Sequence, residues 1–166
     1  MKATRHNGRS GKHGTYDAKH NDRRFDVENS EHIDAERTKM NVYWDCYQGY
    51  SLQNDKDERA RFTFTEIEKA YYVEKYSDHV DGQNERNRKA RHYDRVKTID
   101  AILENNKMCP EETLLQLGNM DGAVSADALA QVSAEYFEEF NRRYGSHVYI
   151  LDWALHLDEA TPHIHE

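Results

Sequence analysis

The sequence predicts an α+β domain, and three observations carry this prediction. Helix-like and strand-like patterns alternate through the second half of the chain. The segment 147–157 is apolar on both faces, which is typical of a strand in the middle of a sheet. A short connection that ends in Thr161-Pro162 then reverses the chain, so the strand that starts at His163 is expected to lie antiparallel beside it.

The first half of the chain gives weaker signals. Residues 1–24 are rich in Gly, His, Asn and basic side chains, and we expect a loop or arm with room for a short strand. A helix is expected to begin at Asp34, and another over 66–76. Between them lies an aromatic stripe, for which a place in the core is favoured over a platform for stacking bases. Its members are Tyr43, Trp44, Tyr47 and Tyr50.

The second half gives the clearest elements. The longest helical pattern spans 85–107, where apolar residues recur every three to four positions and Pro110 follows. A strand is expected over 113–119, and then a helix that is capped by Ser125 and ends at Gly145. The chain stops only a few residues after the strand at His163 begins, so we expect a single domain over 1–166 that is incomplete at its C-terminal end.

Composition excludes several classes of protein. The 166 residues are 37% apolar and 33% charged, with a net charge of −8 and 18 aromatic residues, too many for a disordered acidic chain. No apolar run is long enough for a membrane span, and the N-terminus has no apolar core of a secretory signal. The two cysteines form no CxxC pair, which argues against a disulfide framework or a zinc–thiolate site. A cytoplasmic location is expected.

The charge is unevenly distributed. Residues 1–24 carry a net +5, residues 83–97 a net +4 and residues 111–166 a net −9. The two basic segments are candidates for binding the phosphates of a nucleic acid, although a solvated charged surface explains them equally well. The candidate DNA-binding residues in them are Arg24, Arg86, Arg88, Lys89 and Arg91.

Three histidines are candidates for a metal site. His163 and His165 are two residues apart, so on a strand both rings project from one face. His156 ends the preceding strand, and an antiparallel pair would bring all three rings together. Three neutral imidazoles with open positions suit Zn, Mn, Fe, Ni or Co, and Glu159 in the same turn could orient a ligand or bind as a fourth. Scattered surface histidines are the alternative.

A further histidine, His20, lies in the basic segment 1–24, within His20-Asn21-Asp22-Arg23. Basic neighbours disfavour its protonation, which would leave the ring neutral and nucleophilic. Taken alone, the tetrapeptide is more typical of an exposed loop histidine.

Taken together, three segments resemble a known family. Residues 20–23, 33–41 and 156–165 resemble, in the same order, the three motif regions of the MobV (Pre/Mob) plasmid mobilisation relaxases. The family pattern is HNxR, then Ile-Asp…Glu-Arg-Thr…Asn, then HxDE-x-TPHxH. The last motif is the specific one, and the stretch 50–84 has no alignable counterpart.

The resemblance implies a His-hydrophobe-His endonuclease, with a central antiparallel sheet flanked by helices and a histidine metal site on the sheet. Carried over by position, the implied metal ligands are His156, His163 and His165. Glu159 would support the site, His20 would be the nucleophile, and Asn21 and Arg23 would position it or the scissile phosphate. Arg37 and Asn41 would hold the N-terminal arm in place rather than contact DNA.

The implied activity is metal-dependent, strand-specific nicking and rejoining of plasmid DNA at an origin of transfer, with Mn or Mg as the cofactor. The implied partners are single-stranded or supercoiled plasmid DNA and conjugation coupling proteins. Tyrosine is the nucleophile of most other relaxases, so Tyr16, Tyr43, Tyr47 and Tyr50 stay open as alternatives to His20. A DNA-binding fragment without turnover, and a structural metal-binding protein, are the competing hypotheses.

Overall fold

The computed structural model describes residues 3–9, 17–52, 62–105, 107–119 and 122–166. They form one seven-stranded antiparallel sheet, in which six strands run in the order β1-β4-β7-β6-β2-β3 and β5 pairs with β4. The strands are β1 (Ala3–Arg9), β2 (Val42–Asp45), β3 (Gly49–Leu52), β4 (Glu111–Asn119), β5 (Gly122–Ala123), β6 (Asp152–His156) and β7 (His163–His165). The helices are α1 (Ala18–Asn21), α2 (Phe64–Lys89), α3 (Ile99–Leu103) and α4 (Ala126–Tyr144), with 3₁₀ turns η1 (Thr38–Met40) and η2 (Tyr93–Arg95). The predicted α+β class is confirmed.

The pairing of β6 with β7 decides which side chains share a face. The two strands are antiparallel, as predicted, with His156 opposite His163 and Ala154 opposite His165. The predicted strand over 147–157 starts later, at Asp152, because the N–H groups of His147 and Val148 still donate to the carbonyl of Tyr144 at the end of α4. The outcome is a short central strand with all five residues buried.

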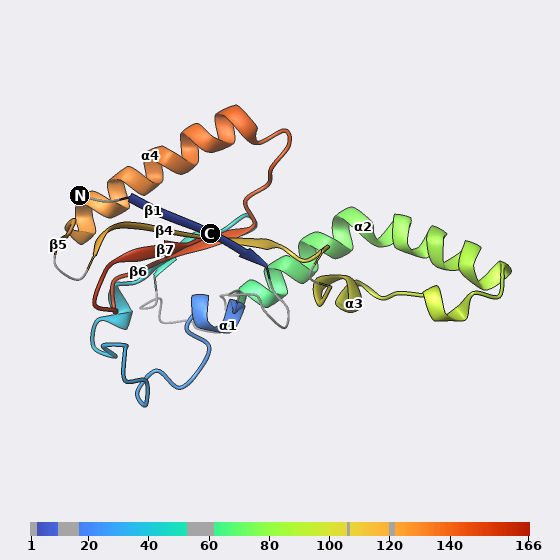
Figure 1. Cartoon of the computed structure of the whole chain (residues 1–166), viewed down its shortest axis with the longest axis horizontal. Coiled ribbons are helices and arrows are strands. Elements are labelled where there is room, and N and C mark those ends of the chain that lie inside the picture. The colour runs from blue at the N-terminus through green and yellow to red at the C-terminus, as the bar shows by residue number, and fades with distance from the viewer. Residues whose placement is uncertain (1–2, 10–16, 53–61, 106, 120–121) are drawn as a thin grey trace.

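One face of the sheet is covered by α4 (Figure 1). Ser125 caps this helix by accepting from the N–H of Ala128, as predicted. Leu129 and Phe137 pack on Leu155 and Ile164 of the central strands, and Phe137 stacks on Trp153 with ring centroids 5.1 Å apart. This apolar layer buries the odd-numbered residues of β6 and leaves the even-numbered ones to the opposite face.

The opposite face carries α1 and the start of α2 (Figure 1). Ala18 and Phe64 pack against Tyr43 and Ala154 in a second apolar cluster. The N–H of Phe64 also donates to Asp22 at 3.1 Å, which ties the start of α2 to the end of α1. The short helix α1 is therefore held against the face on which the histidines project.

A helical arm projects away from the sheet (Figure 1). The helix predicted over 66–76 is part of a 26-residue helix, α2, about 39 Å long at 1.5 Å per residue. The helix predicted over 85–107 is wrong. It breaks after Lys89, Arg91 adopts a left-handed φ of 60°, and the chain returns through η2 and α3. Asn84 and Asn87 hold this return, because their side chains bond the backbone of Lys97 and Arg95 instead of facing solvent.

Two expectations for the first half need correction. No helix begins at Asp34, whose side chain instead accepts from Glu36 and Arg37 in a turn that leads to η1. The aromatic stripe becomes the hairpin of β2 and β3, so its side chains alternate: Tyr43 is 1% exposed and Tyr50 is 64% exposed. Residues 3–9 of the expected arm form an edge strand paired with β4. None of the described helices is both long and apolar enough to cross a membrane.

Candidate functional site

Three histidine rings converge on the face of the sheet opposite α4. His156 comes from β6, and His163 and His165 come from β7. Their ring centroids lie 4.9–5.3 Å apart, and their side chains are 0%, 10% and 13% exposed. Ala154, opposite His165, leaves room for the rings because it has only a methyl group. The structure therefore brings the three predicted residues together.

Each of these rings has one nitrogen held by an acceptor. His156 Nε2 lies 2.8 Å from the carbonyl oxygen of Asn21, and His163 Nδ1 lies 2.8 Å from that of Thr161. His165 Nδ1 lies 2.7 Å from Glu112 Oε1. Carbonyl and carboxylate oxygens only accept, so these nitrogens carry the protons, and in a neutral ring the other nitrogen keeps its lone pair. This is how proteins orient histidines that bind metals.

The opposite ring nitrogens point into the cluster. Among the described residues, His156 Nδ1 and His165 Nε2 are buried without a hydrogen-bond partner, which is costly unless something else satisfies them. Burial, reinforced by the charge of Arg23, lowers the pKa of His156 to about 2, and burial also lowers the pKa of His163. Neutral rings with unused lone pairs fit a divalent metal ion.

Glu159 lies in the middle of this cluster. Its Oε1 is 3.8 Å from His163 Nε2, 4.0 Å from His156 Nδ1 and 2.7 Å from Nη2 of Arg23. Burial opposes ionisation, but the guanidinium of Arg23, which donates to Oε1, helps to lower the pKa of Glu159 to about 2. Within the described ranges, two sets of candidate ligand atoms each lie within 4.8 Å of one another: His156, Glu159 and His163, and His20, His156 and His165.

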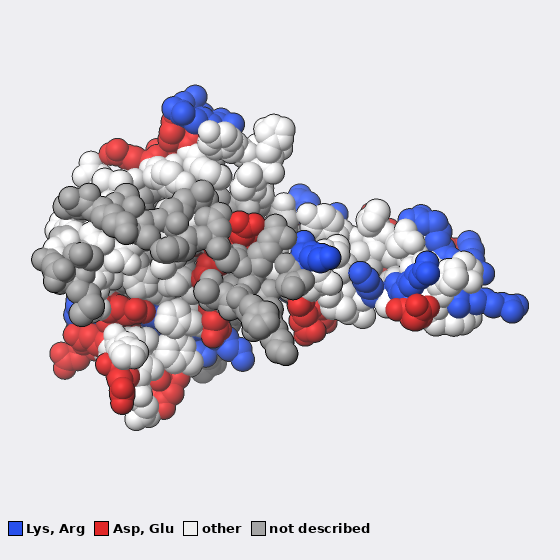
Figure 2. Space-filling view, in the orientation of Figure 1, with Lys and Arg blue, Asp and Glu red and all other residues white. Residues whose placement is uncertain are grey.

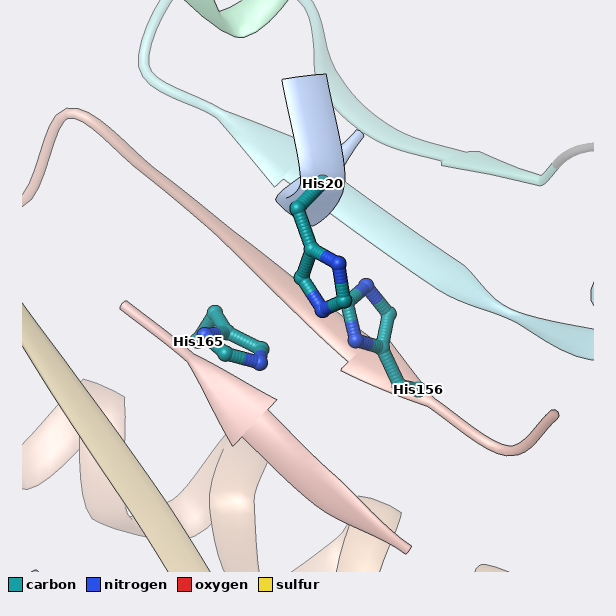
Figure 3. Close-up of side chains that lie close together, drawn as sticks. All are labelled: His20, His156 and His165. Carbon is teal, nitrogen blue, oxygen red and sulfur yellow. The ribbon is translucent and has the colours of Figure 1, made fainter. Parts of the chain in front are cut away.

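His20 lies at the mouth of the cluster, on α1 (Figure 3). Its ring centroid is 5.5 Å from that of His165, and its side chain is 38% exposed, far more than the three strand histidines. Arg23 Nη1 lies 3.2 Å from His20 Nε2. A guanidinium only donates, so in this contact Nε2 accepts with its lone pair. Phe25 stacks on the ring with the centroids 5.8 Å apart.

Asp158 connects all three sequence motifs. Its carboxylate is buried and accepts from Arg23 Nε and Nη2 at 2.9 and 2.8 Å. It also accepts from Thr38 Oγ1 at 3.0 Å and from Asn41 Nδ2 at 2.7 Å. Asn41 in turn accepts from the N–H of Leu157 at 2.7 Å. The three motifs are therefore one hydrogen-bonded unit. Asn41 contacts the third motif and reaches the N-terminal arm only through Asp158, so its predicted role in holding the arm stays a prediction.

Arg23 is held in a strained conformation. Its φ of 57° lies in the left-handed region, which costs a non-glycine residue about 1–2 kcal/mol. The buried pair with Asp158 and the contact with Glu159 offset this cost. The strain places the guanidinium between the two carboxylates and His20.

The predicted DNA-binding residues lie in two places. Asn21 is buried and donates to Glu112 Oε1 at 2.9 Å, next to His165, while Arg24 is half-buried just after α1. The other four (Arg86, Arg88, Lys89 and Arg91) lie at the far end of the arm, where Lys and Arg gather in Figure 2. The structure does not bring this tip to the histidines (Figure 1). A role for these residues in binding DNA stays a prediction.

The alternative nucleophiles lie elsewhere. Tyr43 is buried, Tyr47 donates to Glu74 at 2.9 Å, and Tyr50 packs against Trp153, whose side chain belongs to the core under α4. Tyr16 lies outside the described residues.

Comparison with solved structures finds two matches in fold, both crystal structures of the MobM relaxase domain (MOBV; Mob_Pre) with Mn and a 22-nucleotide oriT DNA of plasmid pMV158. The TM-scores are 0.53 and 0.55, at 18% sequence identity. Each match covers 99% of this chain and 68% of the other. The chain has the fold of a MobV relaxase domain. Comparison of the sequence with family models and with curated proteins finds no significant match.

In this MobV-type fold, sequence reasoning missed three residues beside the histidines. Glu112 orients His165, Asp158 joins the motifs, and Phe25 stacks on His20. Asp158 lies inside the third motif, so its place between two of the candidate site residues was a usable signal. Glu112 and Phe25 carried no signal, because only the pairing of β4 with β7 and the turn after α1 bring them to the site.

Proposed function

We propose that the chain is the nicking domain of a plasmid mobilisation relaxase, which cuts and rejoins one DNA strand at an origin of transfer. One observation carries the proposal. A partly exposed histidine, His20, stands at the mouth of a buried cluster of three imidazoles, two of which have an inward nitrogen without a hydrogen-bond partner among the described residues. The MobM domains of the same fold bind oriT DNA and Mn, which supports the same class of substrate here.

The metal in this proposal is Mn or Mg. His156, His163 and His165 would hold it through the nitrogens that face the cluster, and Glu159 would support them. When bound, the ion neutralises charge that develops on the non-bridging oxygens of the scissile phosphate. The protein contributes oriented ligands, because Asn21, Thr161 and Glu112 fix the other ring nitrogens.

The nucleophile in this proposal is Nε2 of His20, once its lone pair is released from the hydrogen bond that Arg23 donates. Its lone pair forms a bond to phosphorus while a P–O bond of the strand breaks, and the departing oxygen takes up a proton and leaves as a hydroxyl. The ring gives up the proton on Nδ1 and becomes neutral again. The phosphoramidate keeps enough bond energy for the reverse step, in which the hydroxyl attacks and the strand is rejoined. Arg23 and Phe25 hold the ring in place, so little orientation entropy is lost at the reaction.

DNA binding in this proposal uses two basic surfaces. Arg24 lies beside the histidine site, and the arm tip carries Arg86, Arg88, Lys89 and Arg91. Single-stranded or supercoiled plasmid DNA would be the substrate, and conjugation coupling proteins in the cytoplasm would be further partners.

The activity is tested by incubating the protein with Mn and supercoiled plasmid that carries a cognate origin. Open circles support the proposal. A gel shift without open circles supports a DNA-binding fragment without turnover. If the protein neither nicks nor shifts the DNA, the result supports a structural metal-binding protein without a DNA role.

The nucleophile is tested by the chemistry of the covalent adduct. A phosphohistidine bond survives alkali and hydrolyses in mild acid, whereas a phosphotyrosine bond survives acid. We expect an alkali-stable, acid-labile adduct that is lost in His20→Ala and kept in Tyr16→Phe. An acid-stable adduct in His20→Ala would move the assignment to a tyrosine.

The ligands are tested by metal binding and by nicking together. His163→Ala and His165→Ala should each lose tight Mn binding in calorimetry and lose Mn-dependent nicking, while the circular dichroism spectrum stays unchanged. Normal Mn affinity in either variant would remove that residue from the ligand set.

A further inference from the structure

A hollow of about 850 Å³ lies between the first half of α2, the C-terminal half of α4 and the connection 147–151. Its wall is mostly aromatic. The aromatic residues that line it are Tyr71, Tyr72, Tyr76, Tyr136, Phe140, Tyr144 and Tyr149. Tyr71 and Tyr149 stack on each other with centroids 4.8 Å apart, and Tyr76, Tyr144 and Tyr149 are exposed at the rim.

Acidic residues line the same hollow. Glu68 and Asp152 are more than nine-tenths buried, and Oδ2 of Asp152 has no hydrogen-bond partner in the part of the chain that the structure describes. Burial raises the pKa of Asp152 well above its ordinary value, and the charge of Glu68 adds to the shift. Burial likewise raises the pKa of Glu68 to about 8. Two buried acids that share a cavity are expensive to keep in a protein, so they point to a ligand that supplies the positive charge.

The composition of the lining narrows the chemistry of that ligand. Within the described part of the chain, no Lys or Arg lines the hollow, which makes it unsuitable for DNA phosphates. Neither Glu68 nor Asp152 belongs to a compact set of metal ligands among the described residues; the two sets that exist are at the histidines. Aromatic faces and carboxylates together are typical of sites for organic cations, which gain both ion pairing and cation–π contacts.

We propose that this hollow is a binding site for an organic cation, a guanidinium or primary ammonium group on an aliphatic stem. The cation lies against the carboxyl groups of Glu68 and Asp152, and the stem lies along the tyrosine wall. The volume falls within the range of small-molecule sites. This site is separate from the proposed nicking chemistry and does not depend on it.

The direct test titrates the full chain with butylguanidinium in a calorimeter and, in parallel, with butylurea, a neutral analogue of the same shape. Butylguanidinium should bind at millimolar concentration or below, and butylurea should not. Equal affinity for the two would overturn the proposal, because it would show an apolar site without charge recognition. Displacement of butylguanidinium by Mg²⁺ would overturn it too, by assigning the carboxylates to a metal.

Three variants sharpen this test. Glu68→Gln and Asp152→Asn should each weaken butylguanidinium binding about tenfold or more, while Glu138→Gln, an exposed acid on α4, should leave it unchanged. Both buried variants should melt at or above the temperature of the unaltered chain, since each removes an uncompensated buried acid. Unchanged binding in a folded Glu68→Gln would overturn the proposal.

The source of the cation is distinguished by a second ligand. The tripeptide acetyl-Leu-Arg-Leu-amide offers the same guanidinium with apolar neighbours for the tyrosine rim. If the tripeptide binds more tightly than butylguanidinium, the site is assigned to a basic side chain of a protein. If the two bind equally, it is assigned to a free amine or guanidine. In either case Asp152→Asn must lose binding of both ligands.

Discussion

The histidine site and the acidic hollow bury charge in opposite ways. At the histidines, the buried cation Arg23 has Asp158 and Glu159 beside it, both from the same turn. In the hollow, the charge of Glu68 disfavours ionisation of Asp152. No Lys or Arg among the described residues lines the cavity. The first region carries its own counterions and is organised before any ligand arrives. The second lacks a counterion from the described lining, and in our proposal a bound organic cation supplies it.

Removing Asp158 would make the histidine site resemble the hollow, because Arg23 would be left buried without its main partner. We expect Asp158→Ala to destabilise the fold by about 3–5 kcal/mol, measured by urea unfolding. Glu139→Gln is the matched control, since Glu139 pairs with Arg142 and Arg143 on the exposed face of α4 and should change nothing measurable. A small effect of Asp158→Ala would show that the buried network is replaceable.

Glu112 connects the two regions, because it accepts from His165 and its charge also bears on Glu68 and Asp152. Glu112→Gln keeps the shape but weakens the orientation of His165. We expect Mn affinity to fall about 10–100-fold in calorimetry, with Glu111→Gln, its exposed neighbour, as the control. Unaltered Mn affinity would separate Glu112 from the metal site.

The arm tip differs from the hollow in charge, because it carries basic side chains and the hollow is lined by acidic ones. Basic side chains can bind DNA phosphates. Replacing Arg86, Arg88, Lys89 and Arg91 together by Gln should weaken binding of single-stranded DNA. It should also flatten the salt dependence by about 0.7 for each phosphate that the tip no longer neutralises. Filter binding between low and moderate salt measures this slope. The control replaces Arg142 and Arg143, which are already paired with Glu139. An unchanged slope would remove the tip from the DNA surface.

The two regions should respond to pH with opposite signs. Glu68 has a pKa of about 8 in the folded chain and about 4.5 unfolded, so its unfolded form releases a proton first and stability is lost as pH rises between these values. The pKa of His156 is lowered in the folded chain, so the unfolded chain takes up a proton first and folding stability is lost as pH falls below 6.5. We expect the melting temperature of Glu68→Gln, minus that of the unaltered chain, to increase as the pH is raised from 5 to 8. A constant difference would contradict the shift at Glu68.

Local patterns predicted the parts of the molecule that depend on neighbours in sequence. The turn Thr161-Pro162 and the spacing of His163 and His165 were sufficient for the β6–β7 pair and its histidine face. The cap Ser125 was sufficient for the start of α4. The family resemblance added the MobV-type fold, which the structure confirms.

Contacts between distant residues explain what the sequence did not predict. The apolar spacing after Glu85 is helical, but Asn84 and Asn87 recruit the backbone of Lys97 and Arg95 and hold the chain in a reversal. The apolar and acidic residues of the hollow come from α2, α4 and β6, and no local spacing relates them. Glu112 reaches His165 only through the pairing of β4 with β7.

The central position of β7 has a consequence for folding during synthesis. Among the described strands it is the latest in the chain, yet it lies between β4 and β6, which it must join across its two edges. Until residues 163–165 leave the ribosome, those two strands have no neighbour on the side where β7 belongs, and His20 has no ring partners from β7. Contacts of such long sequence separation close slowly. A nascent chain should therefore stay unable to bind metal tightly, and exposed to aggregation, until nearly all of this sequence has been made.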